Sequence, residues 1–181
     1  MIMKKLIYLI IPIFFLGSCI QSELTPDEII KVKETIETQI QVMRKAYNLK
    51  DVEAVKGLVS ESEDILVFGT DAAEVMKSAS DWEQQMKNDF QLFDYADFGE
   101  AKYQSIKVSR YGDMAASVTE SLVMMVIKAD TFNLLLRFAF TWKLENGSWH
   151  IVQGNVSAPS ENQLSQVLKE QMDKEEKRND N

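Results

Sequence analysis

Apolar residues recur at steps of three and four along the first part of the chain. They are Ile29, Val32, Ile36, Ile40, Met43 and Tyr47. This spacing places them on one face of a helix. Thr25 as the N-cap, Pro26 at the first helical position and two acidic residues in the first turn mark where the helix begins. The pattern therefore predicts a long amphipathic helix.

Three shorter elements are expected next. Asp51 can cap a second helix, and the apolar run 65–68 is typical of a strand that ends at Gly69. Ser80 and Glu83 have the spacing of a capping box, which predicts the start of a third helix. The apolar face of this third helix consists of Trp82, Met86, Phe90 and Phe93.

After the third helix the hydrophobic pattern alternates, which is typical of strands. Four strands are expected, at residues 103–108, 115–127, 132–144 and 149–156. Asn146-Gly147 predicts a tight hairpin between the last two, and a short helix is expected from Ser160. Helices followed by antiparallel strands predict an α+β domain. Strands this long twist strongly, so we expect a cone-shaped, curved antiparallel sheet wrapped around the N-terminal helices, with an inner cavity.

The N-terminus has the pattern of a bacterial secretion signal. Lys4 and Lys5 precede an uncharged apolar stretch at 6–16, which is shorter than the ~20 residues that a membrane-spanning helix needs. The stretch closes on Leu-Gly-Ser-Cys at 16–19, which resembles the lipobox of bacterial lipoproteins. An ordinary signal peptide is the alternative, but Cys19 is the only cysteine of the chain and stands where a lipobox requires one. We therefore expect lipidation of Cys19.

These features divide the chain into four parts. A lipoprotein signal peptide (1–18) is followed by a lipidated tether (19–24), a single α+β domain (25–160) and a short helix with a charged tail (161–181). Two or three acyl chains on Cys19 would hold the protein on a lipid bilayer. The predicted location is the bacterial cell envelope, at the outer membrane or the cell surface if the cell is Gram-negative.

Charge and composition exclude several function classes. The chain has 20 basic and 28 acidic residues, and cleavage removes Lys4 and Lys5, so the mature net charge is about −10. Phosphate backbones repel such a surface, so no nucleic-acid partner is expected. With one histidine and one cysteine in the chain, no metal site is expected. The sequence also lacks a Gly-rich phosphate loop, and no cofactor is expected.

Several short motifs lie between residues 36 and 159. They are Ala46-Tyr47, Lys50-Asp51, the run 67–71 with Glu74, Gly112-Asp113, Ala115, Arg137, Asn146-Gly147, Trp149, Ile151-Val152, Ser157 and Pro159. Together they resemble the SnoaL-like branch of the nuclear transport factor 2-like superfamily. The last part is also similar to the association domain of calcium/calmodulin-dependent protein kinase. The resemblance implies a cone-shaped α+β fold with a pocket between sheet and helices, and a dimer through the sheet.

One departure from the family pattern bears on function. Where many members carry His-x-His on the last strand, this chain has Gln153, Gly154 and Asn155. Glutamine and asparagine form hydrogen bonds but do not exchange protons near neutral pH. The sequence therefore favours a non-catalytic domain that binds a small, partly apolar ligand. The candidate pocket residues are Tyr47, Phe68, Trp82, Met124, Arg137, Phe138, Phe140, Trp142, Gln153 and Asn155.

Two other functions stay open. One is a small isomerase, hydratase or cyclase that uses Glu120 or Asp71 as the base, with Tyr47 or Arg137 polarising a carbonyl. The other is an oligomerisation module. Glu120 can also face outward or pair with Arg137, and Asp71 fits an ordinary turn. The strands expected at 115–127 and 132–144 carry apolar residues on both faces. A single layer of sheet can bury only one of these faces within the monomer, so we expect a homodimer through the other, open face.

Overall fold

The computed structural model describes residues 22–61, 64–128 and 130–159. Cys19 and the helix expected from Ser160 lie outside these residues. The described helices are α1 (Pro26–Leu49), α2 (Val52–Lys56) and α3 (Ala79–Leu92). The described strands are β1 (Leu66–Phe68), β2 (Val75–Met76), β3 (Tyr95–Val108), β4 (Met114–Ile127), β5 (Asp130–Glu145) and β6 (Ser148–Ser157).

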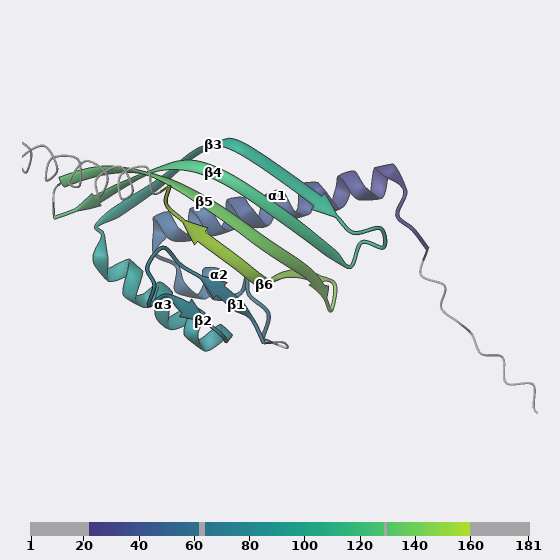
Figure 1. The fold of residues 1–181 in the computed structure, drawn as a ribbon, viewed down its shortest axis with the longest axis horizontal. Helices are drawn as coiled ribbons and strands as arrows, with labels where there is room; N and C mark the ends of the chain where they lie inside the picture. Colours follow the sequence, from purple (N-terminus) through teal and green to yellow (C-terminus); the bar gives the residue numbers. More distant parts are fainter. Residues whose placement is uncertain (1–21, 62–63, 129, 160–181) are drawn as a thin grey trace, which may run out of the picture.

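The strands form one sheet in the order β2-β1-β6-β5-β4-β3. The sheet is curved and unclosed, and α1 runs along its concave side with α2 and α3 beside it (Figure 1). The predicted α+β fold is therefore confirmed. One pairing differs from the antiparallel sheet that the sequence predicts, because β1 lies parallel to β6. β1 and β6 are far apart in the sequence and are not joined by a hairpin, so their connection does not require an antiparallel pairing.

Local hydrogen bonds explain where the helices begin. Thr25 and Glu28 form the capping box of α1: the Glu28 amide donates to Thr25 Oγ1 at 3.3 Å, and the Thr25 amide donates to Glu28 Oε2 at 2.8 Å. The cap predicted at Ser80 is wrong, because Ser78 is the N-cap of α3 and accepts from the Asp81 amide at 3.1 Å. Glu83 instead forms ion pairs on the helix surface.

Strand β3 begins at Tyr95 rather than at residue 103. Its pairing with β4 shifts register between Phe98 and Ala101 and again between Ala101 and Tyr103. Such bulges break the alternation of apolar and polar residues. The first half of β3 therefore had no clear strand pattern in the sequence, although it forms one wall of the cavity described below.

The hydrophobic core lies between the concave face of the sheet and the helices. Its fully buried side chains include Ile36, Val55, Val67, Trp142 and Ile151. Trp142 was predicted to line a ligand pocket, but it packs in this core and its indole Nε1 donates to Ser117 Oγ at 2.8 Å. A buried indole needs such a partner, so Trp142 is a structural residue.

Candidate functional site

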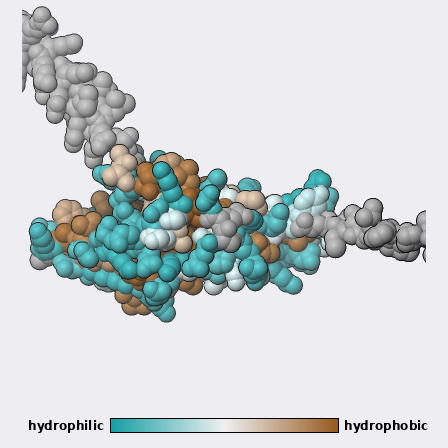
Figure 2. All heavy atoms as spheres, turned by 90° about the horizontal axis from the view of Figure 1, so that it is seen from below, coloured by the Kyte–Doolittle hydropathy of each residue, from teal (hydrophilic) through white to brown (hydrophobic). Residues whose placement is uncertain are grey.

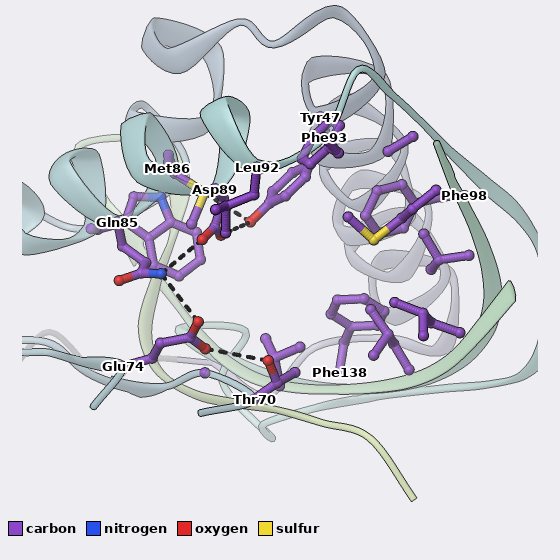
Figure 3. Close-up of a pocket in the computed structure, with 18 of the residues that line it drawn as sticks. Tyr47, Thr70, Glu74, Gln85, Met86, Asp89, Leu92, Phe93, Phe98 and Phe138 are labelled. Carbon is purple, nitrogen blue, oxygen red and sulfur yellow. Dashed lines mark hydrogen bonds between the residues drawn. The ribbon is translucent and has the colours of Figure 1, made fainter. Parts of the chain in front are cut away.

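A cavity of about 290 Å³ lies between α3, the C-terminal part of α1 and the concave face of the sheet (Figure 3). Most of its lining is apolar. These residues are Met76, Trp82, Met86, Leu92, Phe93, Ala96, Phe98, Val123, Met125, Ile127, Leu134, Leu136, Phe138 and Val156. Leu92 and Leu134 are exposed as well as lining the cavity. Hydrophobic residues gather at the end of the molecule that is away from the start of α1 (Figure 2).

Five polar side chains lie together on one side of the cavity, and we call them the polar wall: Tyr47, Thr70, Glu74, Gln85 and Asp89. Gln85 Nε2 donates to Asp89 Oδ1 at 2.7 Å and to Glu74 Oε1 at 3.3 Å. The Tyr47 hydroxyl donates to Met86 Sδ at 2.9 Å and lies 3.5 Å from Asp89 Oδ2. One glutamine amide therefore connects two carboxylates that come from different segments of the chain.

The loop at 69–74 fixes the position of Glu74. Its Oε2 accepts from the Asp71 amide at 3.1 Å and from Thr70 Oγ1 at 3.4 Å. A Cβ at Gly69 would overlap the Glu74 side chain, so this position requires glycine. Asp71 was considered as a catalytic base, but it is exposed and accepts from the Ala73 amide at 2.9 Å. Asp71 therefore shapes the turn and does not line the cavity.

Burial changes the acid–base properties of the polar wall. The pKa of Asp89 is raised to about 6, mainly by burial; the charge of Glu74 acts in the same direction, and the hydrogen bonds from Gln85 and Tyr47 act in the opposite direction. Burial and the charge of Asp89 raise the pKa of Tyr47 well above its usual value. Tyr47 is therefore a hydrogen-bond donor at neutral pH, whereas Asp89 takes up a proton just below neutral pH.

Replacing Asp89 with asparagine should stabilise the protein at neutral pH. The pKa of Asp89 rises from 3.8 to about 6 on folding, so the folded state holds this proton more tightly and stability falls as the pH rises through that interval. The side chain is partly exposed, so we expect Asp89→Asn to gain only about 1 kcal/mol above pH ~6 and nothing near pH ~4. Urea unfolding across this range measures the difference.

The matched control for this prediction is Asp64→Asn. Asp64 is exposed, so the same loss of one negative charge should change stability by less than ~0.5 kcal/mol at each pH. A loss of stability in Asp89→Asn at neutral pH would show that the ionised carboxylate stabilises the fold.

Three of the predicted pocket residues line the cavity: Tyr47, Trp82 and Phe138. Met124 does not, because the alternation of β4 turns its neighbour Met125 inward. Phe68 is exposed on β1. Phe140 is buried in the core beyond Phe138, against Trp142.

A shift in strand register moves Gln153 and Asn155 away from the cavity. On β5, Trp142 pairs with Ile151 but Thr141 pairs with Gln153, so Val152 is the extra residue of a bulge. Beyond the bulge, Phe140 pairs with Gly154 and both amides are exposed. A Cβ at Gly154 would overlap the Phe140 ring. Phe140 therefore packs against Gly154, while Gln153 and Asn155 point to the other face of the strand.

Glu120 and Arg137 lie on the convex face of the sheet, outside the cavity. Arg137 Nε donates to Glu120 Oε2 at 2.7 Å, and Lys102 Nζ lies 3.8 Å from Glu120 Oε1. The Glu120 side chain is 10% exposed and that of Arg137 is 53% exposed. Neither residue lines the cavity, so neither Glu120 as the candidate base nor Arg137 as a candidate pocket residue acts there.

Sequence reasoning missed Glu74, Gln85 and Asp89. A signal for Asp89 was present, because Trp82, Met86, Asp89 and Phe93 follow the steps of a single helix face. A carboxylate on an apolar helix face is either paired or functional. Gln85 and Glu74 had no such signal, because their position depends on how the loop at 69–74 packs against α3.

Across 22–61, 64–128 and 130–159, no group of three or more His, Cys, Asp or Glu side chains is placed to hold a metal ion. None of the helices in this part of the chain is long and apolar enough to cross a membrane.

The fold and the site define a class: a cone-shaped α+β domain with a mostly apolar internal cavity. Residues 36–161 match the family model of the SnoaL-like domain, and the chain therefore belongs to this family. The resemblance seen in the sequence is thus confirmed. A search of curated proteins found no match.

Solved structures of the same fold include proteins with different descriptions. A putative dehydratase of the NTF2-like family from Streptomyces avermitilis is 13% identical, with a TM-score of 0.63 over 75% of this chain and 99% of that one. A putative scytalone dehydratase from Novosphingobium aromaticivorans is 13% identical (TM-score 0.66; 75% and 89% covered). A putative calcium/calmodulin dependent protein kinase II association domain from Xanthomonas campestris is 17% identical (TM-score 0.61; 77% and 96% covered). At these identities the likeness shows the fold alone.

Proposed function

We propose that this protein is a lipid-anchored binding protein of the bacterial cell envelope whose domain takes up a small, mostly apolar ligand. The observation that carries this proposal is the cavity of about 290 Å³, which is apolar except for one polar wall. Ligand pockets usually combine an apolar lining with a few convergent polar groups. The volume lies at the lower end of the range of about 300–1000 Å³ for such pockets, which favours a small ligand.

Lipid attached near the N-terminus would not block the entrance to the cavity. The described chain starts at Ser22, next to the N-terminal end of α1 (Figure 1). The cavity is lined by Tyr47, which lies near the other end of this helix. A helix of 24 residues spans about 36 Å. Lipid at Cys19 would therefore leave the cavity well separated from the attachment point and open to ligands from the surrounding water.

Filling the cavity should abolish binding. In Leu136→Trp the larger side chain enters the cavity from β5, so N-phenylnaphthylamine, a neutral apolar fluorophore, should bind at least about tenfold more weakly than to the native chain. Fluorescence titration measures this. The matched control is Leu135→Trp, which places the same side chain at the next residue of the strand, on the opposite face.

Equal affinities of the two tryptophan variants would mean that the fluorophore binds elsewhere and would remove the support for the cavity as the site. Circular dichroism of both variants checks that the fold is retained.

A proton-transfer enzyme of isomerase, hydratase or cyclase type is a second candidate. The observation that favours it is that the pKa of Asp89 is raised to about 6 beside the protonated Tyr47 hydroxyl. This pair offers a base and a donor that could polarise a carbonyl. In heavy water, the native chain should then exchange the α-hydrogens of a small cyclic ketone faster than Asp89→Asn does. If the native chain and Asp89→Asn exchange these hydrogens at equal rates, the enzyme candidate fails and ligand binding remains the proposed function.

We also propose that the protein forms a homodimer through the convex face of β3, β4 and β5. Val118, Leu122 and Tyr103 are exposed on this face around the ion pair of Glu120 and Arg137. Leu122→Lys should shift sedimentation from dimer towards monomer because it places a charge in the interface. Leu49→Lys, at an exposed leucine on α1, is the control. A native chain that sediments as a monomer at tens of micromolar contradicts the proposed interface.

A further inference from the structure

The polar wall has more hydrogen-bond acceptors than donors. The amide of Gln85 donates to both carboxylates, those of Asp89 and Glu74. The Tyr47 hydroxyl donates to Met86 Sδ at 2.9 Å. Glu74 also accepts from Thr70 Oγ1 and from the Asp71 amide, and the Tyr47 hydroxyl lies 3.5 Å from Asp89 Oδ2. A carboxylate can accept about four hydrogen bonds, so both groups retain acceptor capacity after these contacts. Both groups line the cavity (Figure 3), and a ligand that meets them has to supply donors.

None of the described residues that line the cavity is lysine, arginine or histidine. The Lys50 ammonium is not part of the lining, and it lies 4.8 Å from the centre of the Phe93 ring. The buried Arg44 lines a separate void of about 10 Å³, which shares Phe98 and Phe138 with the cavity, and its Nη2 donates to Ser121 Oγ at 2.9 Å. The field of the polar wall is therefore negative, and an anionic ligand would be repelled.

Aromatic rings are the second feature that favours a cation. Tyr47, Trp82, Phe93, Phe98 and Phe138 all line the cavity. The rings of Tyr47 and Phe98 lie 5.3 Å apart, and those of Phe98 and Phe138 lie 5.9 Å apart, so they form a continuous aromatic surface. Aromatic faces attract cations, most strongly where water is excluded.

We propose that the cavity is selective for a small amphipathic amine, with its ammonium group at Asp89 and Glu74 and its apolar body against the aromatic residues. This inference rests on the proposed ligand-binding function and gives the chemical class of the ligand. An ammonium group supplies both the charge and the three donors that the wall lacks. The size of the cavity, about 290 Å³, fits a ring with a short chain.

Three probes with the same body and different head groups test the proposal: phenethylamine, phenethyl alcohol and hydrocinnamate. Calorimetric titration of the full chain at neutral pH should give an amine affinity at least about tenfold above that of the alcohol, and no measurable binding of the carboxylate. Asp89→Asn should remove most of this preference, because the amine loses the negative charge that its ammonium group contacts. Asp64→Asn, which removes one exposed charge, should leave all three affinities unchanged.

The pH dependence gives a second readout. The amine should bind more weakly at pH ~5 than at pH ~8, because Asp89 becomes neutral below its pKa of about 6. The other titratable groups that face Asp89 are Glu74, from the loop before β2, and Tyr47, from α1. The alcohol should show no such dependence. Glu74→Gln should weaken amine binding without removing the pH dependence that Asp89 causes.

The outcomes separate the two proposals. If the alcohol binds and the amine binds no more tightly, or if Asp89→Asn retains the preference, the amine inference is overturned while the ligand-binding function stands. If neither these probes nor N-phenylnaphthylamine bind, both proposals fail. Because Asp89→Asn is expected to be at least as stable as the native chain, misfolding does not explain a loss of amine binding, and a thermal melt checks this.

Discussion

Replacing Arg137 with leucine should lower the free energy of unfolding by about 2 kcal/mol, whereas Glu120→Leu should cost less than about 1 kcal/mol. Both charges lie in apolar strands. The structure shows that the pair is asymmetric: the Glu120 side chain is 10% exposed and that of Arg137 is 53% exposed. Without Arg137, a nearly buried carboxylate keeps only Lys102, at 3.8 Å. Without Glu120, the guanidinium remains in water.

Chemical unfolding of the native chain, both single variants and the double variant measures this asymmetry. The double variant should lose less than Arg137→Leu alone, because the carboxylate that needs a partner is absent. Measurements at two protein concentrations separate this effect from dimer dissociation. Equal losses from the two single changes would contradict the asymmetric pair.

Replacing Cys19 with alanine should abolish lipidation completely. Cys19 is the only thiol in the chain, so no second site can accept the lipid. Labelled fatty acid should enter the native chain and be absent from Cys19→Ala, which should accumulate as a precursor with its signal peptide or as a soluble form. Ser22→Ala, three residues further on, should be labelled like the native chain. Label retained in Cys19→Ala would rule out the lipobox interpretation.

The sequence predicted the fold because local signals there are strong and agree with one another. The capping box at Thr25 and Glu28 sets the start of α1, and the structure contains it. The Asn146-Gly147 turn joins β5 to β6, with positive φ at both residues. The alternating pattern of β4 and β5 predicted the ends of both strands to within two residues of where the structure has them. Each of these features depends on residues close together in the chain.

The site was less predictable, because it depends on contacts between distant segments. Tyr47, Trp82 and Phe138 could be assigned to the cavity since each lies on the apolar face of a regular element. Gln153 and Asn155 could not be placed, because one bulged residue turns every later side chain to the other face.

The sequence by itself thus determined the order of the helices and long strands, the family and which face of most regular elements is apolar, since helix and strand periods follow from the spacing of residues along the chain. Only the tertiary structure decided that Asp89 and Glu74 share one amide hydrogen-bond donor, Gln85, at the edge of an apolar cavity. The loop at 69–74 and helix α3 meet through packing, and burial there raises the pKa of Asp89 to about 6. Burial is a property of the assembled fold, so the chemical character of this carboxylate could not be read from its place in the chain.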